Sequence, residues 1–178
     1  LYANIDESKK LFLAIIKEGK NHGLSLCGAH AMDIMRMESG FLHWGHDISP
    51  EENQYQAGLK FAISYKKNIN FVGKEALLKI KDQNPTKSLA MMVLKDNIPG
   101  EPLLLHEEPI YLDDKIIGRT TSGNYSFNFK KNISFGYVNS GNTIENLVNK
   151  NLSIEVEKKK YPVTIIKKPL NQKNIKNN

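Results

Sequence analysis

The residues best suited to chemistry are concentrated between positions 32 and 48. Asp33 and Arg36 stand three residues apart in a largely apolar stretch, so a helix would bring them together as an ion pair. A charge removed from water must be paired, and the planar guanidinium of Arg can hold a carboxylate through two hydrogen bonds. Two histidines, the single tryptophan and an aspartate follow within a few residues, at His43, Trp44, His46 and Asp47.

Three interpretations of this segment remain open from the residues alone. In the structural one, the ion pair anchors the helix and Trp44 fills the core. In the binding one, the segment forms the wall of a pocket and Trp44 stacks on a flat heterocycle. The third is a metal held by His43, His46 and Asp47. Because this spacing matches no familiar zinc motif and no further ligand cluster stands out, we predict no metal site.

The composition is that of an ordinary globular protein, with 40% hydrophobic and 25% charged residues among 178. The net charge of +6 arises near the C-terminal end, since seven lysines lie at or after Lys158 and no acid follows Glu157. The preceding residues include 18 basic and 19 acidic ones, a net charge of −1, which does not indicate a nucleic-acid partner. No apolar run approaches the roughly 20 residues of a membrane span.

Cys27 is the only cysteine, so an intrachain disulfide is excluded. We interpret it as a small buried thiol rather than a nucleophile. A reducing cytoplasm is the predicted location.

The first 82 residues predict mixed α and β structure. Apolar residues at helical spacing predict an amphipathic helix over residues 8–20, and the Ala- and Met-rich stretch 28–40 predicts a short helix buried on most sides. A strand that starts at the first residue has no turn before it, so we expect a fragment of a longer protein. The other expected elements are a strand end over 1–5, a strand over 61–65 and a helix that follows a turn within 70–80.

Beyond the polar, proline-containing stretch 81–86, the hydrophobic period changes to two. Turn signals separate short alternating segments, a pattern typical of a small antiparallel barrel. The expected strands cover residues 88–95, 109–112, 115–121, 132–138, 151–157 and 160–166. We therefore predict an α+β fold with three parts: the C-terminal part of a mixed α/β domain over 1–82, a jelly-roll-like antiparallel β-barrel over 83–170, and a disordered basic tail over 171–178.

Motifs at several places along the chain occur in a familiar order. Asp33-x-x-Arg36-Met37-Glu38-x-Gly40 is followed by His43-Trp44-Gly45-His46-Asp47-Ile48. Later motifs are Gln56-Ala57-Gly58-Leu59 and the stretches 71–77, 117–123, 133–138 and 161–163. This ordered set resembles the glycine-cleavage T-protein (aminomethyltransferase) family, and its H-W-G-H-D form is most similar to the folate domain of dimethylglycine and sarcosine dehydrogenases.

The resemblance implies a transferase of one-carbon metabolism that moves a one-carbon unit from an aminomethyl or methylamine-derived donor to tetrahydrofolate. It implies folate-binding roles for Arg36, His43, Trp44 and Ser122, the last in a turn over 121–123 that faces the pocket. It also implies supporting roles for Asp33, Glu38 and Asp47. The implied partners are folate, an amine donor, and either a lipoyl carrier protein or a linked flavin domain, without nucleic acid or membrane.

Two departures from the family pattern bear on activity. Met32 stands where T-proteins usually carry an Arg that contacts folate. The catalytic aspartate of the family lies upstream of the matched residues, and its pterin-binding glutamate falls at about the residue before Leu1, so we expect the chain alone to be inactive. Two other classes remain open: a non-catalytic folate-binding module and the tail of an FAD oxidoreductase, although the chain contains no dinucleotide-binding G-x-G-x-x-G motif.

Overall fold

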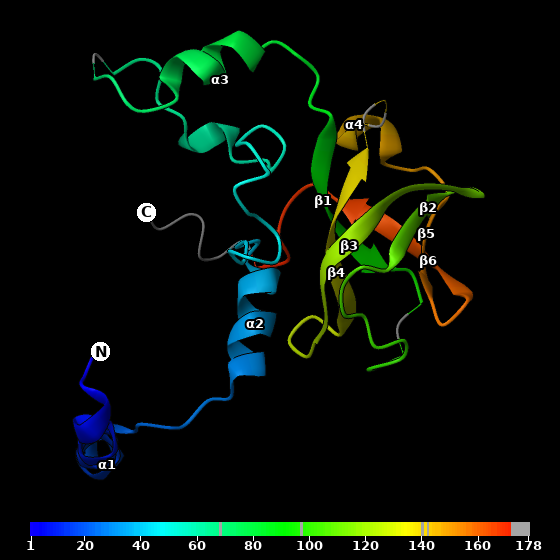
Figure 1. Cartoon of the computed structure of the whole chain (residues 1–178). Helices are drawn as coiled ribbons and strands as arrows, with labels where there is room; N and C mark the ends of the chain where they lie inside the picture. Colours follow the sequence, from blue (N-terminus) through cyan, green and yellow to red (C-terminus); the bar gives the residue numbers. More distant parts are fainter. Residues whose placement is uncertain (68, 97, 140, 142, 172–178) are drawn as a thin grey trace. The chain divides into compact units, whose positions relative to one another are not determined.

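The computed structural model describes residues 1–67, 69–96, 98–139, 141 and 143–171, and Figure 1 labels its elements. Its contacts form two compact units, residues 1–32 and 33–178. The first unit contains helix α1 (Ile5–Gly19), the 3-10 helix η1 (Lys20–His22) and the beginning of helix α2 (Ala29–Glu38). The second contains the rest of α2, the 3-10 helix η2 (Lys60–Ala62), helix α3 (Lys74–Ile80) and a β-barrel with one further helix.

Helix α1 confirms the expected amphipathic helix but begins earlier than predicted. Asp6 and Glu7 lie in its first turn and Lys17 in its last, where each charge favours the helix dipole. Gly23 ends the following 3-10 turn with a φ of 73°, a conformation that suits glycine. The strand predicted over residues 1–5 is wrong, because the acidic first turn extends the helix back to Ile5.

Helix α2 confirms the second expected helix, but its burial differs from the prediction. Within it only Met37 and Glu38 are buried, whereas Met32 and Met35 are 65% and 52% exposed. Gly40 follows with a φ of 75° and ends the helix. The expectation of burial on most sides is therefore wrong, since only the C-terminal end of α2 is buried in a core.

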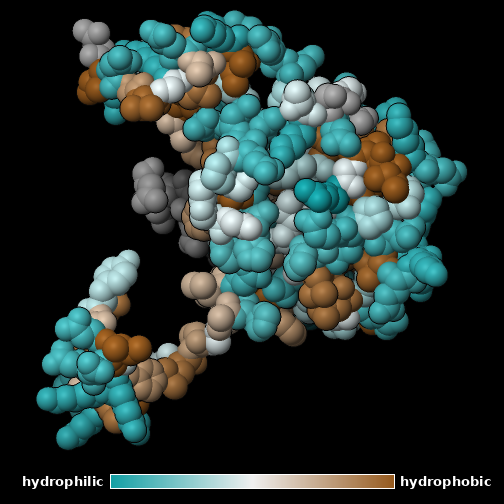
Figure 2. All heavy atoms as spheres, in the orientation of Figure 1, coloured by the Kyte–Doolittle hydropathy of each residue, from teal (hydrophilic) through white to brown (hydrophobic). Residues whose placement is uncertain are grey.

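Residues 41–86 contain little regular structure, and this part includes η2 and α3. The helix expected within 70–80 is confirmed as α3. The strand expected over 61–65 is wrong, because Lys60–Ala62 form a 3-10 turn whose end is closed by a 3.2 Å hydrogen bond from Ile63 N to Lys60 O. Its alternating apolar residues have no sheet to pair with, and Phe61 is 85% exposed. Figure 2 shows apolar atoms at the surface of the part that contains α3.

Six antiparallel strands close into a barrel in the order β1-β4-β3-β2-β5-β6 (Figure 1). Their bounds are β1 Lys87–Leu94, β2 Pro109–Leu112, β3 Lys115–Ser126, β4 Lys131–Asn139, β5 Leu152–Val156 and β6 Lys159–Ile166. All six predicted strands are confirmed, and β3 extends five residues beyond its predicted end. Helix α4 (Ile144–Leu147) was not predicted; the hydroxyl of Thr143 accepts a hydrogen bond at its N-terminus.

Two clusters of apolar side chains show how the barrel is packed. Alternate residues of β1, Ala90, Met92 and Leu94, belong to the cluster that contains Ile110 and Ile154 and fills the interior. The intervening residues Leu89, Met91 and Val93 join a second cluster around Met37, Ile133 and Phe135. The C-terminal end of α2 thus packs on the outer face of β1 and β4, which brings the residues after α2 next to the barrel.

The predicted fold class is confirmed, since the structure combines a few helices with a closed antiparallel barrel. The division into parts at residue 82 stays a prediction, because the compact units of the structure divide at another position. The predicted disordered tail over 171–178 lies outside the described residues except for Asn171. In the part of the chain that the structure describes, no helix combines the length and apolar character needed to cross a membrane.

Candidate functional site

Arg36 is the centre of a polar cluster that joins the end of α2 to the barrel. Its Nε donates to Asp33 Oδ1 at 2.8 Å, and its Nη2 lies at the same distance from that oxygen. Its Nη1 donates to Asp47 Oδ2 at 2.5 Å and to Phe41 O at 3.4 Å, and its Nη2 donates to Ser122 Oγ at 2.8 Å. These contacts engage the whole guanidinium group, and they confirm the Asp33–Arg36 pair expected from the sequence.

Asp47 is the buried anion of this cluster, with a side chain that is 0% exposed. Its Oδ1 accepts hydrogen bonds from the hydroxyls of Thr121 and Ser122 at 2.6 and 2.8 Å. Its Oδ2 accepts a hydrogen bond from the backbone N–H of His43 at 2.9 Å and a second one from the Arg36 guanidinium. Ion pairing and several hydrogen bonds together offset the cost of removing this carboxylate from water.

A β-bulge explains how two neighbouring residues of one strand reach the same carboxylate. Successive side chains of a regular strand point to opposite faces. The pairing of β3 with β4 shifts register between Thr120 and Ser122, so Thr121 and Ser122 both donate to Asp47. The turn predicted over 121–123 is therefore wrong, because these residues lie inside β3 and Ser122 is buried, whereas their position at the folate pocket stays a prediction.

Glu38 anchors the end of α2 at a second point. Its side chain is buried, and its two oxygens accept hydrogen bonds from Ser126 Oγ at 2.6 Å and Asn128 Nδ2 at 2.9 Å. Its backbone carbonyl accepts the N–H of Asn171 at 2.8 Å. Glu38 therefore connects α2, the β3–β4 turn and the segment after β6, an arrangement that the sequence did not predict.

The loop after α2 presents aromatic side chains to solvent. Trp44 is 65% exposed, so the interpretation of Trp44 as a core residue is wrong, whereas its role in a pocket wall stays a prediction. The His43 and His46 rings lie 4.5 Å apart between centroids. Both oxygens of Asp47 already accept hydrogen bonds, so this carboxylate is not free to join the two imidazoles around a metal.

Tyr137 and Glu52 extend the polar contacts along the barrel. Tyr137 Oη donates to the backbone carbonyl of Asp47 at 2.9 Å, and burial, followed by the charges of Glu52 and Asp47, raises the pKa of this phenol. Lys87 Nζ lies 2.5 Å from Glu52 Oε1 and 4.8 Å from the centre of the Tyr137 ring. Burial alone would raise the pKa of Glu52, but hydrogen bonds from Lys87 and Ser49 outweigh it and lower the pKa below its usual value.

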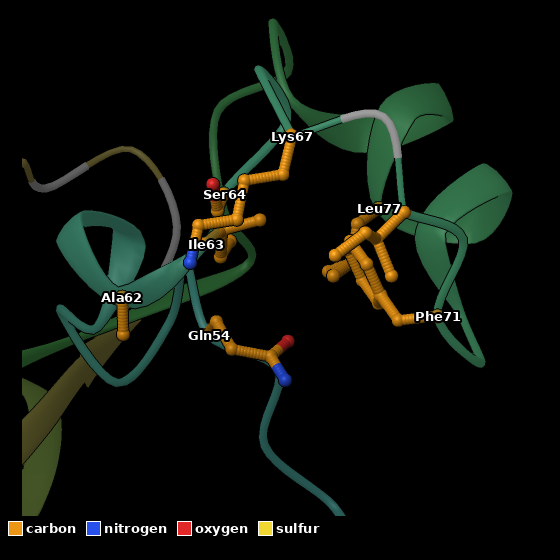
Figure 3. A pocket seen from close by; sticks show the side chains of 8 residues that line it. Gln54, Ala62, Ile63, Ser64, Lys67, Phe71 and Leu77 are labelled. Carbon is orange, nitrogen blue, oxygen red and sulfur yellow. The ribbon is translucent and has the colours of Figure 1, made fainter.

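A pocket of about 470 Å³ lies beside α3. Figure 3 shows Ile63 and Lys67 on one side of it and Phe71 and Leu77 on the other. The complete lining is Gln54, Ala62, Ile63, Ser64, Lys67, Ile69, Phe71 and Leu77. Sequence reasoning missed this pocket, because its residues come from a loop, a 3-10 turn and a helix that share no common period.

A tyrosine pair connects the two stretches that supply the polar residues of this pocket. The hydroxyls of Tyr55 and Tyr65, which adjoin Gln54 and Ser64 in the chain, are 2.6 Å apart. Burial and this hydrogen bond raise the pKa of Tyr55 to about 12. The Tyr55 hydroxyl therefore stays protonated at neutral pH, and its hydrogen bond with Tyr65 can keep the pocket lining in place.

Two family descriptions match the chain in order. The GCVT N-terminal domain matches residues 1–67, and the glycine cleavage T-protein C-terminal barrel domain matches residues 87–171. The second match coincides with the closed barrel described above. The fold is therefore that of a T-protein barrel joined to part of its preceding domain. The chain belongs to the glycine cleavage T-protein family.

Several curated relatives agree with this assignment. A 4-methylaminobutanoate oxidase (formaldehyde-forming) from Paenarthrobacter nicotinovorans is 40% identical over 70% of this chain and 15% of its own length. The mitochondrial dimethylglycine dehydrogenase of Homo sapiens is 32% identical over 96% of this chain and 19% of its own length. An aminomethyltransferase from Symbiobacterium thermophilum is 34% identical over 78% of this chain and 36% of its own length.

A solved structure shares the fold. The glycine cleavage system aminomethyltransferase T from Bartonella henselae superposes with a TM-score of 0.67, at 22% identity, over 79% of this chain and 38% of that one. Together with the curated relatives, it shows that the chain spans well under half the length of the proteins it matches.

Proposed function

We propose that the chain serves tetrahydrofolate-dependent one-carbon transfer, with an aminomethyl group or an N-methylated amine as the donor. The observation that carries this proposal is the ordered match to two T-protein family descriptions over 1–67 and 87–171. The names of the three curated relatives support it, since each name describes an enzyme that acts on an N-methylated compound or transfers an aminomethyl group.

The pocket beside α3 suits part of a folate molecule. Its apolar wall, with Phe71 and Leu77, can cover an aromatic ring, and the Lys67 ammonium can pair with a glutamyl carboxylate. The amide of Gln54 can donate to or accept from the linking amide of the ligand. Bound tetrahydrofolate would supply the nucleophilic nitrogen that takes up the one-carbon unit.

The four proposed folate-binding residues divide into two groups. His43 and Trp44 are exposed, and the Trp44 indole offers a flat face on which a heterocycle can stack. Arg36 and Ser122 are engaged with Asp47, which also holds the backbone N–H of His43. We infer that Arg36 and Ser122 influence folate by positioning the loop that carries His43 and Trp44.

The same burial argues against a catalytic carboxylate at Glu38 or Asp47. A general acid or base must be within reach of the substrate proton, yet both side chains are buried and hydrogen-bonded through both oxygens. This favours a second candidate function for the chain by itself, a non-catalytic folate-binding module. A lipoyl carrier protein or a linked flavin domain, and a cytoplasmic location, stay predictions; one of the relatives is mitochondrial.

Folate binding is tested by titrating the chain with tetrahydrofolate under anaerobic conditions and following the heat or the Trp44 fluorescence. We expect Lys67→Gln to weaken binding at least tenfold, because it removes the cation that pairs with the carboxylate. Lys66→Gln is the matched control, since this neighbouring exposed lysine does not line the pocket. Equal affinity for the two variants would place folate elsewhere.

Catalysis is tested separately by supplying tetrahydrofolate and an aminomethyl or formaldehyde donor to the chain and measuring methylene-tetrahydrofolate. We expect no rate above the uncatalysed background. The carboxylates of Asp47 and Glu38 are buried and engaged in hydrogen bonds, so they are not available for proton transfer. Turnover that is lost in Asp47→Asn but kept in Asp114→Asn, an exposed control, would show that Asp47 is catalytic after all.

A further inference from the structure

The loop that carries Trp44 is a compact turn of the backbone. The N–H of Gly45 donates to Ile48 O at 2.8 Å, and Trp44 and Ile48 form a β-bridge. The N–H of Asp47 donates to His43 O at 2.9 Å. Gly45 permits this tight turn, because its φ of 89° lies in the left-handed region that suits glycine. A loop closed by its own hydrogen bonds moves as one piece, so a contact that fixes its backbone to the barrel also fixes Trp44.

Asp47 attaches this loop to the barrel through two different groups. Its carboxylate pairs with Arg36 and accepts hydrogen bonds from Thr121 and Ser122 of β3. Its backbone carbonyl accepts a hydrogen bond from the hydroxyl of Tyr137 of β4 at 2.9 Å. The second contact uses neither the Arg36 charge nor the Asp47 carboxylate, so it can hold the loop independently of them.

The Tyr137 side chain is itself held in place. The residue is only 7% exposed, and Lys87 Nζ lies 4.8 Å from the centre of its ring, a cation–π contact. The same ammonium pairs with Glu52 at 2.5 Å, which keeps it near the ring. Burial, followed by the charges of Glu52 and Asp47, raises the pKa of the phenol, so the hydroxyl remains a hydrogen-bond donor at neutral pH. Tyr137 thus presents a fixed donor to the loop.

From these contacts we propose that Tyr137 is a positioning residue for Trp44, which it orients by holding the backbone of the loop against β4. The inference rests on the folate-binding function proposed above, in which the exposed Trp44 indole is the surface on which a heterocycle stacks. A stacking surface that is fixed before the ligand arrives loses less entropy on binding, so it binds the ligand more tightly than a mobile one does. Tyr137 acts through the loop and not by contact with the ligand.

Hydrogen exchange of the ligand-free chain, measured for each amide by NMR, tests the positioning directly. Tyr137→Phe removes the hydroxyl and keeps the ring, so the barrel should remain folded. We expect the amides of Gly45 and Asp47 to exchange about tenfold faster than in wild type, because the loop opens more often, while the amides of β4 stay protected. Tyr111→Phe is the matched control, since this tyrosine of β2 bonds to Glu155 instead of to the loop. Equal exchange of the loop amides in the two variants would overturn the proposal.

Fluorescence gives a second, independent measurement, because Trp44 is the only tryptophan of the chain. Time-resolved anisotropy separates the fast local motion of an indole from the slow tumbling of the whole molecule. We expect the amplitude of the fast motion to be larger in Tyr137→Phe than in wild type or Tyr111→Phe. The same amplitude in all three proteins would show that Tyr137 does not orient Trp44.

Calorimetric titration with tetrahydrofolate then connects the position of Trp44 to binding. We expect Tyr137→Phe to bind about tenfold more weakly than wild type, and Tyr111→Phe to bind as wild type does. A wild-type chain that did not bind tetrahydrofolate would refute the proposed function, whereas exchange and anisotropy would still show whether Tyr137 positions Trp44. Weaker binding by Tyr137→Phe without faster exchange would mean that Tyr137 contacts the ligand, and unchanged affinity would mean that it has no part in binding; either result would contradict the proposal.

Discussion

Replacing Arg36 with methionine is the sharpest test of the polar cluster. The substitution keeps most of the side-chain length and removes the guanidinium that contacts Asp33, Asp47 and Ser122. Asp47 would then be a carboxylate with no exposed surface and no cation beside it. The hydrogen bonds from Thr121 and Ser122 would remain and would reduce the penalty.

The expected loss of stability follows from the burial of Asp47. Breaking a buried ion pair by removing one partner costs about 3–5 kcal/mol. Methionine fills much of the vacated volume, so a large cavity does not form. We therefore expect the free energy of unfolding to fall by about 3–4 kcal/mol.

Urea unfolding followed by circular dichroism measures this loss. With an m-value of about 2 kcal/mol/M, the midpoint should move down by about 1.5–2 M. Arg119→Met is the matched control, because its 2.8 Å ion pair with Glu107 is largely exposed and should contribute less than about 1 kcal/mol. If Arg36→Met lost no more stability than Arg119→Met, the cluster would not be the buried anchor described here.

A double-mutant cycle separates the Arg36–Asp47 pair from other contacts. Asp47→Asn removes the buried negative charge while keeping the shape of the side chain. We expect the double variant to be at least about 1 kcal/mol more stable than the sum of the two single losses predicts, because the two charges compensate each other. Additive losses would contradict a direct ion pair.

Two further predictions concern the barrel. Gly118→Ala should destabilise the protein by about 3 kcal/mol or more in urea unfolding, because a Cβ would lie 1.9 Å from the backbone oxygen of Tyr137, whereas Gly28→Ala meets no atom within 4 Å and should be nearly neutral. Because the folded protein lowers the pKa of Glu52, this carboxylate stabilises the fold at pH values above its ordinary pKa of 4.5. The stabilisation is lost as the pH falls through the folded-state pKa. The stability advantage of wild type over Glu52→Gln should therefore shrink between pH 6 and pH 3. A difference that stays constant over this range would show that the ion pair between Lys87 and Glu52 does not stabilise the fold.

The barrel could be predicted from the sequence because its strands have two different faces. In β1, Ala90, Met92 and Leu94 fill the interior while the residues between them face outward. The hydrophobic pattern of the sequence therefore repeats every two residues. The same rule fails for residues 61–65, which alternate but have no partner strand. Periodicity identifies a residue pattern, whereas a strand also needs hydrogen-bonding neighbours.

The candidate site could be predicted only as far as local spacing reaches. The i, i+3 spacing of Asp33 and Arg36 predicted their ion pair, which the structure contains. The contacts of Arg36 with Asp47 and Ser122, 11 and 86 residues away along the chain, depend on the β-bulge in β3 and on how α2 packs on the barrel. Neither a bulge nor that packing has a signature in the sequence near Arg36.

The structure separates groups that hold the fold from groups that remain able to act on a ligand. Arg36, Asp47 and Glu38 have the residue types of a catalytic centre, yet their polar atoms are engaged with each other or with the barrel. Groups that could recognise a ligand lie in less buried positions, such as Trp44 and Lys67. Because acid–base chemistry needs an accessible proton donor or acceptor, the buried cluster is better suited to orient the loop around Trp44 than to transfer protons.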